Sequence, residues 1–295
     1  MYSDYKKVCK VFKENCILSD FTTFKIGGIG KIVFFPKTAE EFKDLLVLCH
    51  KKGETPFILG NGSNLLVSDQ GYQGVIICTR RLDDIKFENN IVLANAGAKL
   101  PALCFEAQKR SLSGLEFACG IPATLGGAIK MNAGAYGNAI GNVVEYVTVF
   151  RRGEVCIEKP TFGYRKSSID DESIIIGASL RLERLDRDLI KRQIFLNGKA
   201  RKFSQPTGYS AGSVFLSVGG VSAGYYVDKA GLKGLQIGGA KVSEKHANFI
   251  INTGKSTSSD VCALIQKIKE EVYGKFGINL CTEIRFLGEF NETLR

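Results

Sequence analysis

The chain has 295 residues, of which 44% are hydrophobic and 24% charged, and its formal net charge is +10. This length suits two domains or one large one, and the composition is ordinary for a globular protein with an apolar core. No apolar run approaches the roughly 18 residues of a membrane helix, which argues against a function inside the bilayer. The first residues, Met1–Lys7, lead into no apolar segment of the kind a secretory signal needs.

The charge and the cysteines narrow the class of protein further. Lysine and arginine are spread along the chain without a block of five, and no nucleic-acid motif is present, so the positive charge favours phosphorylated small ligands. The nine cysteines include no CxxC pair and predict neither a disulfide framework nor a zinc site. With only His50 and His246 available, we expect no metal centre, and we expect a cytoplasmic location.

The predicted elements of the N-terminal half are short and mixed. Residues 1–20 are expected to form a helix or an extension, and residues 21–36 to form two strand-like runs. Thr38 and Glu41 make a capping box for a helix that ends at Gly53. Further strands are predicted at Pro56–Leu59, Val75–Cys78, Ile91–Asn95, Val143–Phe150 and Ile174–Leu180, with a helix at Leu100–Arg110.

The second half begins with a charged, helix-permissive segment, Asp186–Phe203, which Pro206 stops. We place a domain boundary near residue 186, giving an extension (1–20), a first domain (21–185) and a second domain (186–295). The second domain has an irregular glycine-rich section, a strand at Ala247–Asn252, a helix capped by Ser258 and a final strand at Leu280–Leu287. Together the elements predict an α+β fold.

Two glycine-rich loops are the strongest candidates for a binding site. Gly114–Gly137 is dense in glycine and alanine, and its regular apolar residues indicate that it is buried. Because glycine lets a backbone approach a ligand closely, this segment suits a large anionic cofactor, and equally a turn series packed on its own domain. The second loop, Gly60–Asn64, follows a strand and reads equally as a phosphate-binding nest of amides or as a hairpin turn.

Three further residues are candidates for chemistry, although their patterns alone favour ordinary roles. Alternation in the last predicted strand puts Glu283 and Arg285 on one face, where a partly exposed ion pair at a sheet surface is the simpler interpretation. Ser213 lies among small residues and is typical of a turn serine. Arg165 follows Tyr164 at a strand edge, as a surface charge does.

Taken together and in order, the motifs resemble those of the UDP-N-acetylenolpyruvoylglucosamine reductase (MurB) family, over almost the whole chain from Thr22 to Glu289. The motifs are LGNGSNLLVSD (59–69), GLEFACGIPATLGGAIKMNAGAYG (114–137), GYRKSSI (163–169), AGSVF (211–215), AGLKGLQIGGAKVSEKHANFIIN (230–252) and EIRFLGE (283–289).

The resemblance implies a fold and a cofactor site. The first domain would be an FAD-binding domain of the vanillyl-alcohol-oxidase (PCMH) type, and the C-terminal α+β domain would bind a UDP-sugar. The two glycine-rich loops would hold the pyrophosphate and isoalloxazine of FAD. The implied FAD-binding residues are Gly60, Asn61, Gly62, Ser63, Asn64, Leu65, Gly120, Ile121, Pro122, Thr124, Gly126, Gly127, Asn132, Ala133 and Gly134.

The resemblance also implies an activity, that of a UDP-N-acetylmuramate dehydrogenase in peptidoglycan precursor synthesis. In the family, NADPH reduces the flavin, and the flavin then reduces UDP-N-acetylglucosamine enolpyruvate to UDP-N-acetylmuramate. Negative charge that develops beside the substrate carboxylate needs fixed cationic or hydrogen-bonding groups, and the neighbouring carbon needs a proton donor. Carried over by motif, Ser213 is the proton donor, and Arg165 and Glu283 stabilise the enolate.

Some features separate this chain from the family pattern. Ser204 stands where the family often has lysine, and Tyr225-Tyr226 replaces a more usual pair. The short interval between Arg165 and Ser213 indicates the shorter, lidless subtype (type II). We expect a monomer without nucleic-acid or membrane partners. Two alternatives are an FAD-dependent oxidase of another small substrate and a non-catalytic binder of nucleotides or nucleic acid.

Overall fold

The computed structural model describes residues 2–290 and divides into two compact units, each assembled from separate stretches of sequence. Unit 1 comprises the chain up to Lys13, Ile32–Asn61 and Gly74–Arg201. Unit 2 comprises Glu14–Lys31, Gly62–Gln73 and the chain from Lys202 onward. The boundary predicted near residue 186 therefore falls inside unit 1. Which ligand each predicted domain binds stays a prediction.

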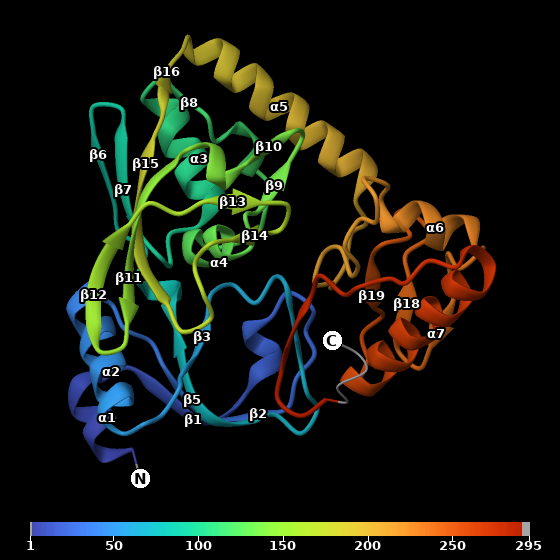
Figure 1. Cartoon of the computed structure of the whole chain (residues 1–295), viewed down its shortest axis with the longest axis horizontal. Coiled ribbons are helices and arrows are strands. Elements are labelled where there is room, and N and C mark those ends of the chain that lie inside the picture. Colours follow the sequence, from blue (N-terminus) through green and yellow to red (C-terminus); the bar gives the residue numbers. More distant parts are fainter. Residues whose placement is uncertain (1, 291–295) are drawn as a thin grey trace. The chain divides into compact units, whose positions relative to one another are not determined.

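The core of unit 1 is a five-stranded antiparallel sheet (Figure 1). Its strand order is β12 (Glu154–Glu158), β11 (Val144–Arg151), β15 (Ile174–Arg181), β7 (Ile91–Asn95) and β6 (Ile85–Glu88). The short helix α4 (Leu125–Lys130) packs against β7 and β15. Buried side chains of the sheet, of α4 and of α3 (Leu100–Lys109) form one apolar cluster, so the glycine-rich segment Gly114–Gly137 is part of this core.

The N-terminal region differs from its prediction. Residues 2–20 contain α1 (Ser3–Val8), β1 (Phe12–Ile17) and the start of a single turn of 3-10 helix. Only one of the two expected strands between residues 21 and 36 is present, β2 (Ile29–Phe34). The preceding residues are irregular because Lys25 and Gly27 take positive φ angles, which are incompatible with a strand. A second sheet has the order β1-β2-β5-β3, with β3 at Phe57–Leu59 and β5 at Tyr72–Cys78.

The predicted cap of α2 (Ala39–Lys51) is confirmed in its main feature. The Thr38 hydroxyl accepts a hydrogen bond from the Glu41 amide at 3.1 Å. The Glu41 carboxylate accepts from the Lys37 amide rather than from that of Thr38, so the box closes one residue earlier. Gly53, with φ +66°, ends the helix as predicted.

Unit 2 consists of a small sheet, two helices and irregular chain. Helix α7 (Ser258–Phe276) packs against α6 (Ala223–Lys229) and against β17 (Gln236–Ile237) and β18 (Ala240–Val242), which lies beside β19 (Ile250–Asn252) (Figure 1). The N-cap of α7 is Thr257, not the predicted Ser258. Thr257 makes a reciprocal capping box with Asp260, whereas Ser258 donates its hydroxyl to Asp69.

The final strand is shorter than predicted. Strand β20 covers only Arg285–Leu287 and pairs in parallel with β4 (Leu65–Val67). The remaining elements are β8 (Leu112–Ser113), β9 (Gly134–Ala135), β10 (Asn138–Ala139), β13 (Phe162–Gly163), β14 (Lys166–Ser167), β16 (Glu183–Arg184) and α5 (Arg187–Ser204).

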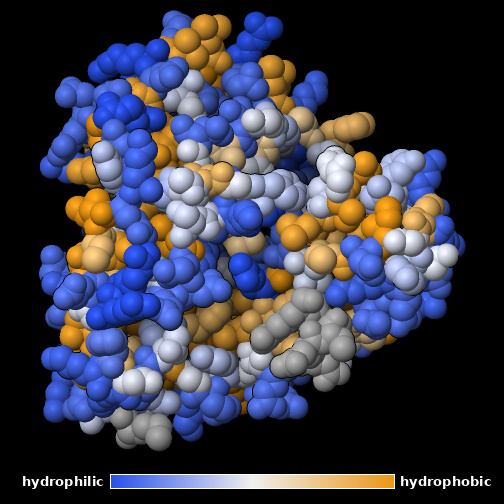
Figure 2. All heavy atoms as spheres, viewed as in Figure 1, coloured by the Kyte–Doolittle hydropathy of each residue, from blue (hydrophilic) through white to orange (hydrophobic). Residues whose placement is uncertain are grey.

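The surface and the thiols agree with the composition. Hydrophilic side chains dominate the visible face, with hydrophobic ones scattered between them (Figure 2). All nine cysteines are free thiols. Within residues 2–290, none of the helices has the length and apolar character needed to cross a membrane.

Candidate active site

The loop Gly60–Asn64 is not a hairpin turn. Strand β3 before it pairs with β5, whereas β4 after it pairs with β20, so the flanking strands lie in different sheets. Gly62 is buried and takes φ +61°, and a Cβ there would lie 2.4 Å from the Phe21 carbonyl oxygen. Of the two interpretations that the sequence left open, the hairpin is therefore excluded.

The main-chain amides of residues 61–64 are open within the described part of the chain. None of the N–H groups of Asn61, Gly62, Ser63 and Asn64 donates a hydrogen bond to another residue of the described chain, 2–290. The carbonyls are held differently: the Arg80 guanidinium donates to the oxygens of Gly60 and Asn61 at 3.2 and 3.0 Å. Because amides without a partner are unfavourable once shielded from water, successive open amides indicate an anion site.

In unit 1, the start of this loop meets the glycine-rich segment Gly114–Gly137. The Asn61 side-chain amide donates to the Pro122 carbonyl at 2.7 Å. A Cβ on Gly60 would lie 2.4 Å from the Thr124 hydroxyl, so only glycine fits at that crossing. Leu125 and Gly126 donate their amides to Ala98 and Ala96, which fixes the segment to the core. Four of the predicted cofactor residues thus lie together: Gly60, Asn61, Pro122 and Thr124.

The structure places Arg165 against the same segment. Arg165 is in the turn between β13 and β14, with φ +55°, and its Nη1 donates to the Gly134 carbonyl at 3.3 Å. The Asn132 side chain ties this turn down: its amide donates to Gly163 at 2.9 Å, and its oxygen accepts from the Gly141 amide at 3.0 Å. Arg165 is therefore built into unit 1 and is not the loose surface charge that its pattern favoured.

In unit 2, Ser213 and Glu283 lie on neighbouring extended segments. The Val214 carbonyl accepts from the Glu283 amide at 2.7 Å, and Phe215 forms an antiparallel bridge with Thr282. The Asn64 side chain donates to the Glu283 carbonyl at 3.1 Å. The Asn64 carbonyl in turn accepts from the Arg285 amide at 2.9 Å.

The pairing of this segment also corrects the predicted faces. Ile284 and Leu287 are both buried while Arg285 is exposed, so strict alternation does not continue through Leu280–Leu287. The prediction that Glu283 and Arg285 share a face assumed one continuous strand over Leu280–Leu287. That strand begins only at Arg285, because Glu283 and Arg285 bond to two different segments.

The remaining predicted cofactor residues occupy supporting positions. Leu65 pairs with Arg285, Ile121 donates its amide to Ala118, and Ala133 donates its amide to Ala128. Ser63 and Gly127 are in the loops described above. A Cβ on Gly120 would lie 2.5 Å from Cδ of Arg201, which therefore runs directly over that glycine.

Sequence reasoning missed three residues that shape the candidate site: Arg80 and Arg201 at the glycine-rich loops, and Asn248 beside the Ser213 segment. Burial lowers the pKa of the Arg201 guanidinium, and the nearby Tyr136 phenol opposes this shift. Burial likewise raises the pKa of the Cys119 thiol beside it, against the effect of the Arg201 charge. Asn248 had a detectable signal, a polar residue in an apolar run, and it is almost completely buried. Nothing in the sequence distinguishes Arg80 or Arg201 from the other basic residues.

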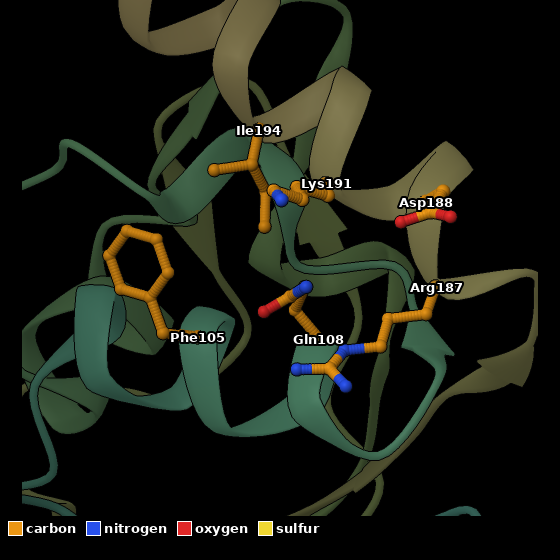
Figure 3. Close-up of a pocket in the computed structure, with 6 residues that line it drawn as sticks. All are labelled: Phe105, Gln108, Arg187, Asp188, Lys191 and Ile194. Carbon is orange, nitrogen blue, oxygen red and sulfur yellow. The ribbon is translucent and has the colours of Figure 1, made fainter.

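A cavity of about 490 Å³ in unit 1 lies apart from these residues. It is lined by two residues of α3 and four of α5: Phe105, Gln108, Arg187, Asp188, Lys191 and Ile194 (Figure 3). In Figure 3 the side chain of Arg187 extends from α5 toward Gln108 of α3. No predicted site residue lines the cavity, so volume alone does not locate the chemistry.

Comparisons with known proteins agree with this geometry. Residues 30–157 match the model of the FAD binding domain. Residues 204–287 match that of the UDP-N-acetylenolpyruvoylglucosamine reductase C-terminal domain. The chain is 15% identical to an alkyldihydroxyacetonephosphate synthase structure, over 63% of this chain and 41% of that one, with a TM-score of 0.50. The predicted α+β fold with an FAD-binding domain is thereby confirmed.

Full-length relatives extend the match over nearly the whole chain. The chain is 44% identical to UDP-N-acetylenolpyruvoylglucosamine reductase of Clostridium botulinum, over 92% of this chain and 90% of that protein. The enzyme of the same name from Caldicellulosiruptor bescii is 42% identical, over 96% and 93%. The crystal structure of the Thermus caldophilus enzyme (MurB) superposes with a TM-score of 0.83 at 35% identity, over 94% of this chain and all of that one. The chain therefore belongs to the UDP-N-acetylenolpyruvoylglucosamine reductase family.

Proposed function

We propose that this protein is a UDP-N-acetylmuramate dehydrogenase: it reduces UDP-N-acetylglucosamine enolpyruvate to UDP-N-acetylmuramate with FAD and NADPH, as a cytoplasmic monomer. The observation that carries the proposal is the run of open amides at Asn61–Asn64. The names of the relatives support the substrate and the reaction.

The loop residues fit FAD by their chemistry. A pyrophosphate is a dianion with several acceptor oxygens, and successive amides are donors that suit it without a side-chain cation. Arg80 keeps the Gly60 and Asn61 carbonyls occupied, which turns the acceptors of this loop away from the anion. The cofactor's contribution is the transfer of a hydride from NADPH to the enolpyruvyl group.

The protein's own groups complete the reduction. Ser213 gives its hydroxyl proton to the carbon next to the substrate carboxylate and regains a proton from solvent. The enolpyruvyl double bond thereby takes up one hydride and one proton, and NADPH is oxidised. Arg165 as a cation, and Glu283 as a protonated hydrogen-bond donor, stabilise the negative charge on the substrate before the proton arrives.

The proposed roles affect two half-reactions differently: reduction of the flavin by NADPH and its reoxidation by the enolpyruvyl sugar. The test measures the two rates separately. Under anaerobic conditions, purified protein with FAD is reduced by NADPH until the flavin absorbance is lost. UDP-N-acetylglucosamine enolpyruvate is then added and the return of absorbance is followed. We expect Ser213→Ala to be reduced at a rate within about twofold of the parent. Its reoxidation should slow by about 10²–10⁴-fold, the range of general acid catalysis.

Ser210→Ala is the matched control, because it removes a hydroxyl three residues away in the same segment. It should leave both half-reactions unchanged. Equal slowing of both half-reactions in Ser213→Ala would contradict the proton-donor role. Reoxidation by oxygen but not by the enolpyruvyl sugar in the parent protein would instead favour the oxidase alternative.

A further inference from the structure

The side chain of Asn248 makes an unusual pair of buried hydrogen bonds in unit 2. Its Oδ1 accepts from the Phe215 amide at 2.9 Å, and its Nδ2 donates to the Phe215 carbonyl at 2.8 Å. The residue is only 5% exposed, and both bonds are shielded from water. One amide side chain thus satisfies both main-chain groups of a single residue, as a neighbouring strand would.

We propose that Asn248 is the positioning residue for the proton donor Ser213, an inference that rests on the proposed function. The Asn248 main chain adds a third bond, because its carbonyl accepts from the Val214 amide at 2.8 Å. Asn248 therefore fixes the two residues that directly follow Ser213.

The hydrogen bonds around Val214 and Phe215, which we call the frame, also fix the main chain of Glu283 relative to that of Ser213. The Val214 amide donates to the Asn248 carbonyl, and the Val214 carbonyl accepts from the Glu283 amide, so both bonds are made by one residue. Leu216 donates to the Cys281 carbonyl at 2.9 Å and closes the frame on the other side. The main chain at Ser213 and the main chain at Glu283 are thus coupled through Val214.

A frame is needed here because the segment has no regular sheet around it. Ser213 and Phe215 form isolated bridges, to Phe249 and Thr282, and belong to no strand. A displacement of about 1 Å at a reacting group lowers a rate by about 10²-fold, so a proton donor on irregular chain requires outside support. Only an amide side chain offers a donor and an acceptor in the spacing of a peptide.

The test compares Asn248→Ala and Asn248→Asp with Ser213→Ala in the two half-reactions of the FAD-loaded protein. We expect reduction by NADPH within about twofold of the parent and reoxidation by the enolpyruvyl sugar slowed by about 10²-fold. Asn248→Asp keeps the acceptor for the Phe215 amide but loses the donor. It serves as the second variant if the alanine protein does not fold. Hydrogen exchange at the Phe215 amide should rise in Asn248→Ala more than exchange at the α7 amides.

Asn252→Ala is the matched control. Asn252 is 6% exposed and belongs to β19 in the same unit, but its side chain donates to the Phe24 and Lys25 carbonyls at 3.0 and 3.2 Å. The Asn252 side chain also accepts from the amides of Gly254 and Ser256 at 2.8 and 3.1 Å. Its loss therefore removes four side-chain hydrogen bonds, against two in Asn248→Ala, and none of the four involves residues 210–216. It should lower stability and leave the ratio of the two half-reaction rates unchanged.

The outcomes separate the two proposals. If Ser213→Ala slows reoxidation selectively and the Asn248 variants do not, the positioning role is wrong while the proposed function stands. The positioning role is equally overturned if Asn252→Ala gives the same selective slowing. If Ser213→Ala itself shows no selective effect, the proposed proton donor is wrong.

Discussion

The main-chain amides of two stretches, Asn61–Asn64 and Val214–Phe215, differ in whether they are bonded within the protein. At Asn61–Asn64 the main-chain amides are open, while the carbonyls of Gly60 and Asn61 are held by Arg80. At Val214–Phe215 amides and carbonyls are all engaged, by Asn248 and Glu283. The backbone of the first stretch is open to a ligand, whereas the backbone of the second is fully bonded and fixes the chain that directly follows Ser213.

The difference teaches which substitutions each stretch tolerates. A site made of amides depends on conformation, so adding a Cβ at a crowded glycine is harmful while many other changes are not. A site made of side chains on a satisfied backbone depends on atom identity, so removing one hydroxyl or one amide is harmful. Variants that add a Cβ and variants that delete a polar group should therefore fail at different steps.

The largest effect is expected from Gly62→Ala. The new Cβ would lie 2.4 Å from the Phe21 carbonyl oxygen and 2.9 Å from the Thr22 Cα, and these main-chain atoms have little freedom to move. The protein should lose FAD, measured as the flavin-to-protein absorbance ratio after purification. Gly219→Ala is the control, because Gly219 has nearly the same φ, +58°, and no atom within 4 Å of its Cβ. It should lose about 1–2 kcal/mol of stability and keep FAD.

Arg165→Met should come next. It removes a cation that is held at the Gly134 carbonyl, and we expect reoxidation by the enolpyruvyl sugar to slow by about 10²–10³-fold with FAD content unchanged. Arg152→Met is the control, since Arg152 also has a positive φ, +50°, but pairs with the exposed Glu172. Similar slowing in both variants would show that general charge, not the position of Arg165, matters.

Asn132→Gly tests whether a predicted cofactor residue acts through the Arg165 turn. Glycine tolerates the φ of +42° at this position, so the variant removes only the bonds to Gly163 and Gly141. We expect FAD content to stay within about twofold and reoxidation to slow by about tenfold, less than in Arg165→Met. Asn89→Gly, at φ +56° in the turn between β6 and β7, should have neither effect. Loss of FAD in Asn132→Gly would place the side chain on the cofactor instead.

Asp260→Asn should have the smallest effect, and on stability alone. The amides of Thr257 and Gly239 hold the pKa of the Asp260 carboxyl below its usual value. Because the folded pKa is the lower one, the ionised group stabilises the fold above the unfolded pKa, and this contribution disappears as pH falls through the folded pKa. Urea unfolding should show a loss of about 0.5–1 kcal/mol at pH 7 and a smaller difference near pH 3. A constant difference across pH would contradict this cause.

Local patterns predicted local structure well. The strand Ile91–Asn95 has the expected bounds, and Thr38 begins α2 as its spacing with Glu41 required. The cap of α7 was misplaced by one residue because Thr257 and Ser258 are both good caps, and only Asp69 decides which of them faces the helix. Pairings between distant segments were out of reach, since no local pattern encodes that β4 pairs with β20.

The candidate site shows the same limit. Local patterns favoured ordinary structural roles for Ser213, Arg165 and Glu283. Only the order of several motifs along the chain, through the family resemblance, made them candidates for catalysis. Their mutual support depends on contacts such as the one between Asn64 and Glu283, which are 219 residues apart. The predicted catalytic and cofactor roles of these residues stay predictions until the half-reactions are measured.

Unit 2 is assembled from segments that lie far apart in the sequence, and this has a consequence for synthesis on the ribosome. Its apolar cluster joins Phe24, Ile26 and Leu66 to residues that begin at Ala211 and end near the C-terminus, including Leu280 and Ile284. The early contributors leave the exit tunnel long before their partners are translated, whereas all of the cluster around β7, β11 and β15 lies between Val92 and Leu182. A nascent chain released before its last segment would therefore expose those three apolar side chains and give chaperones and proteases a lasting target.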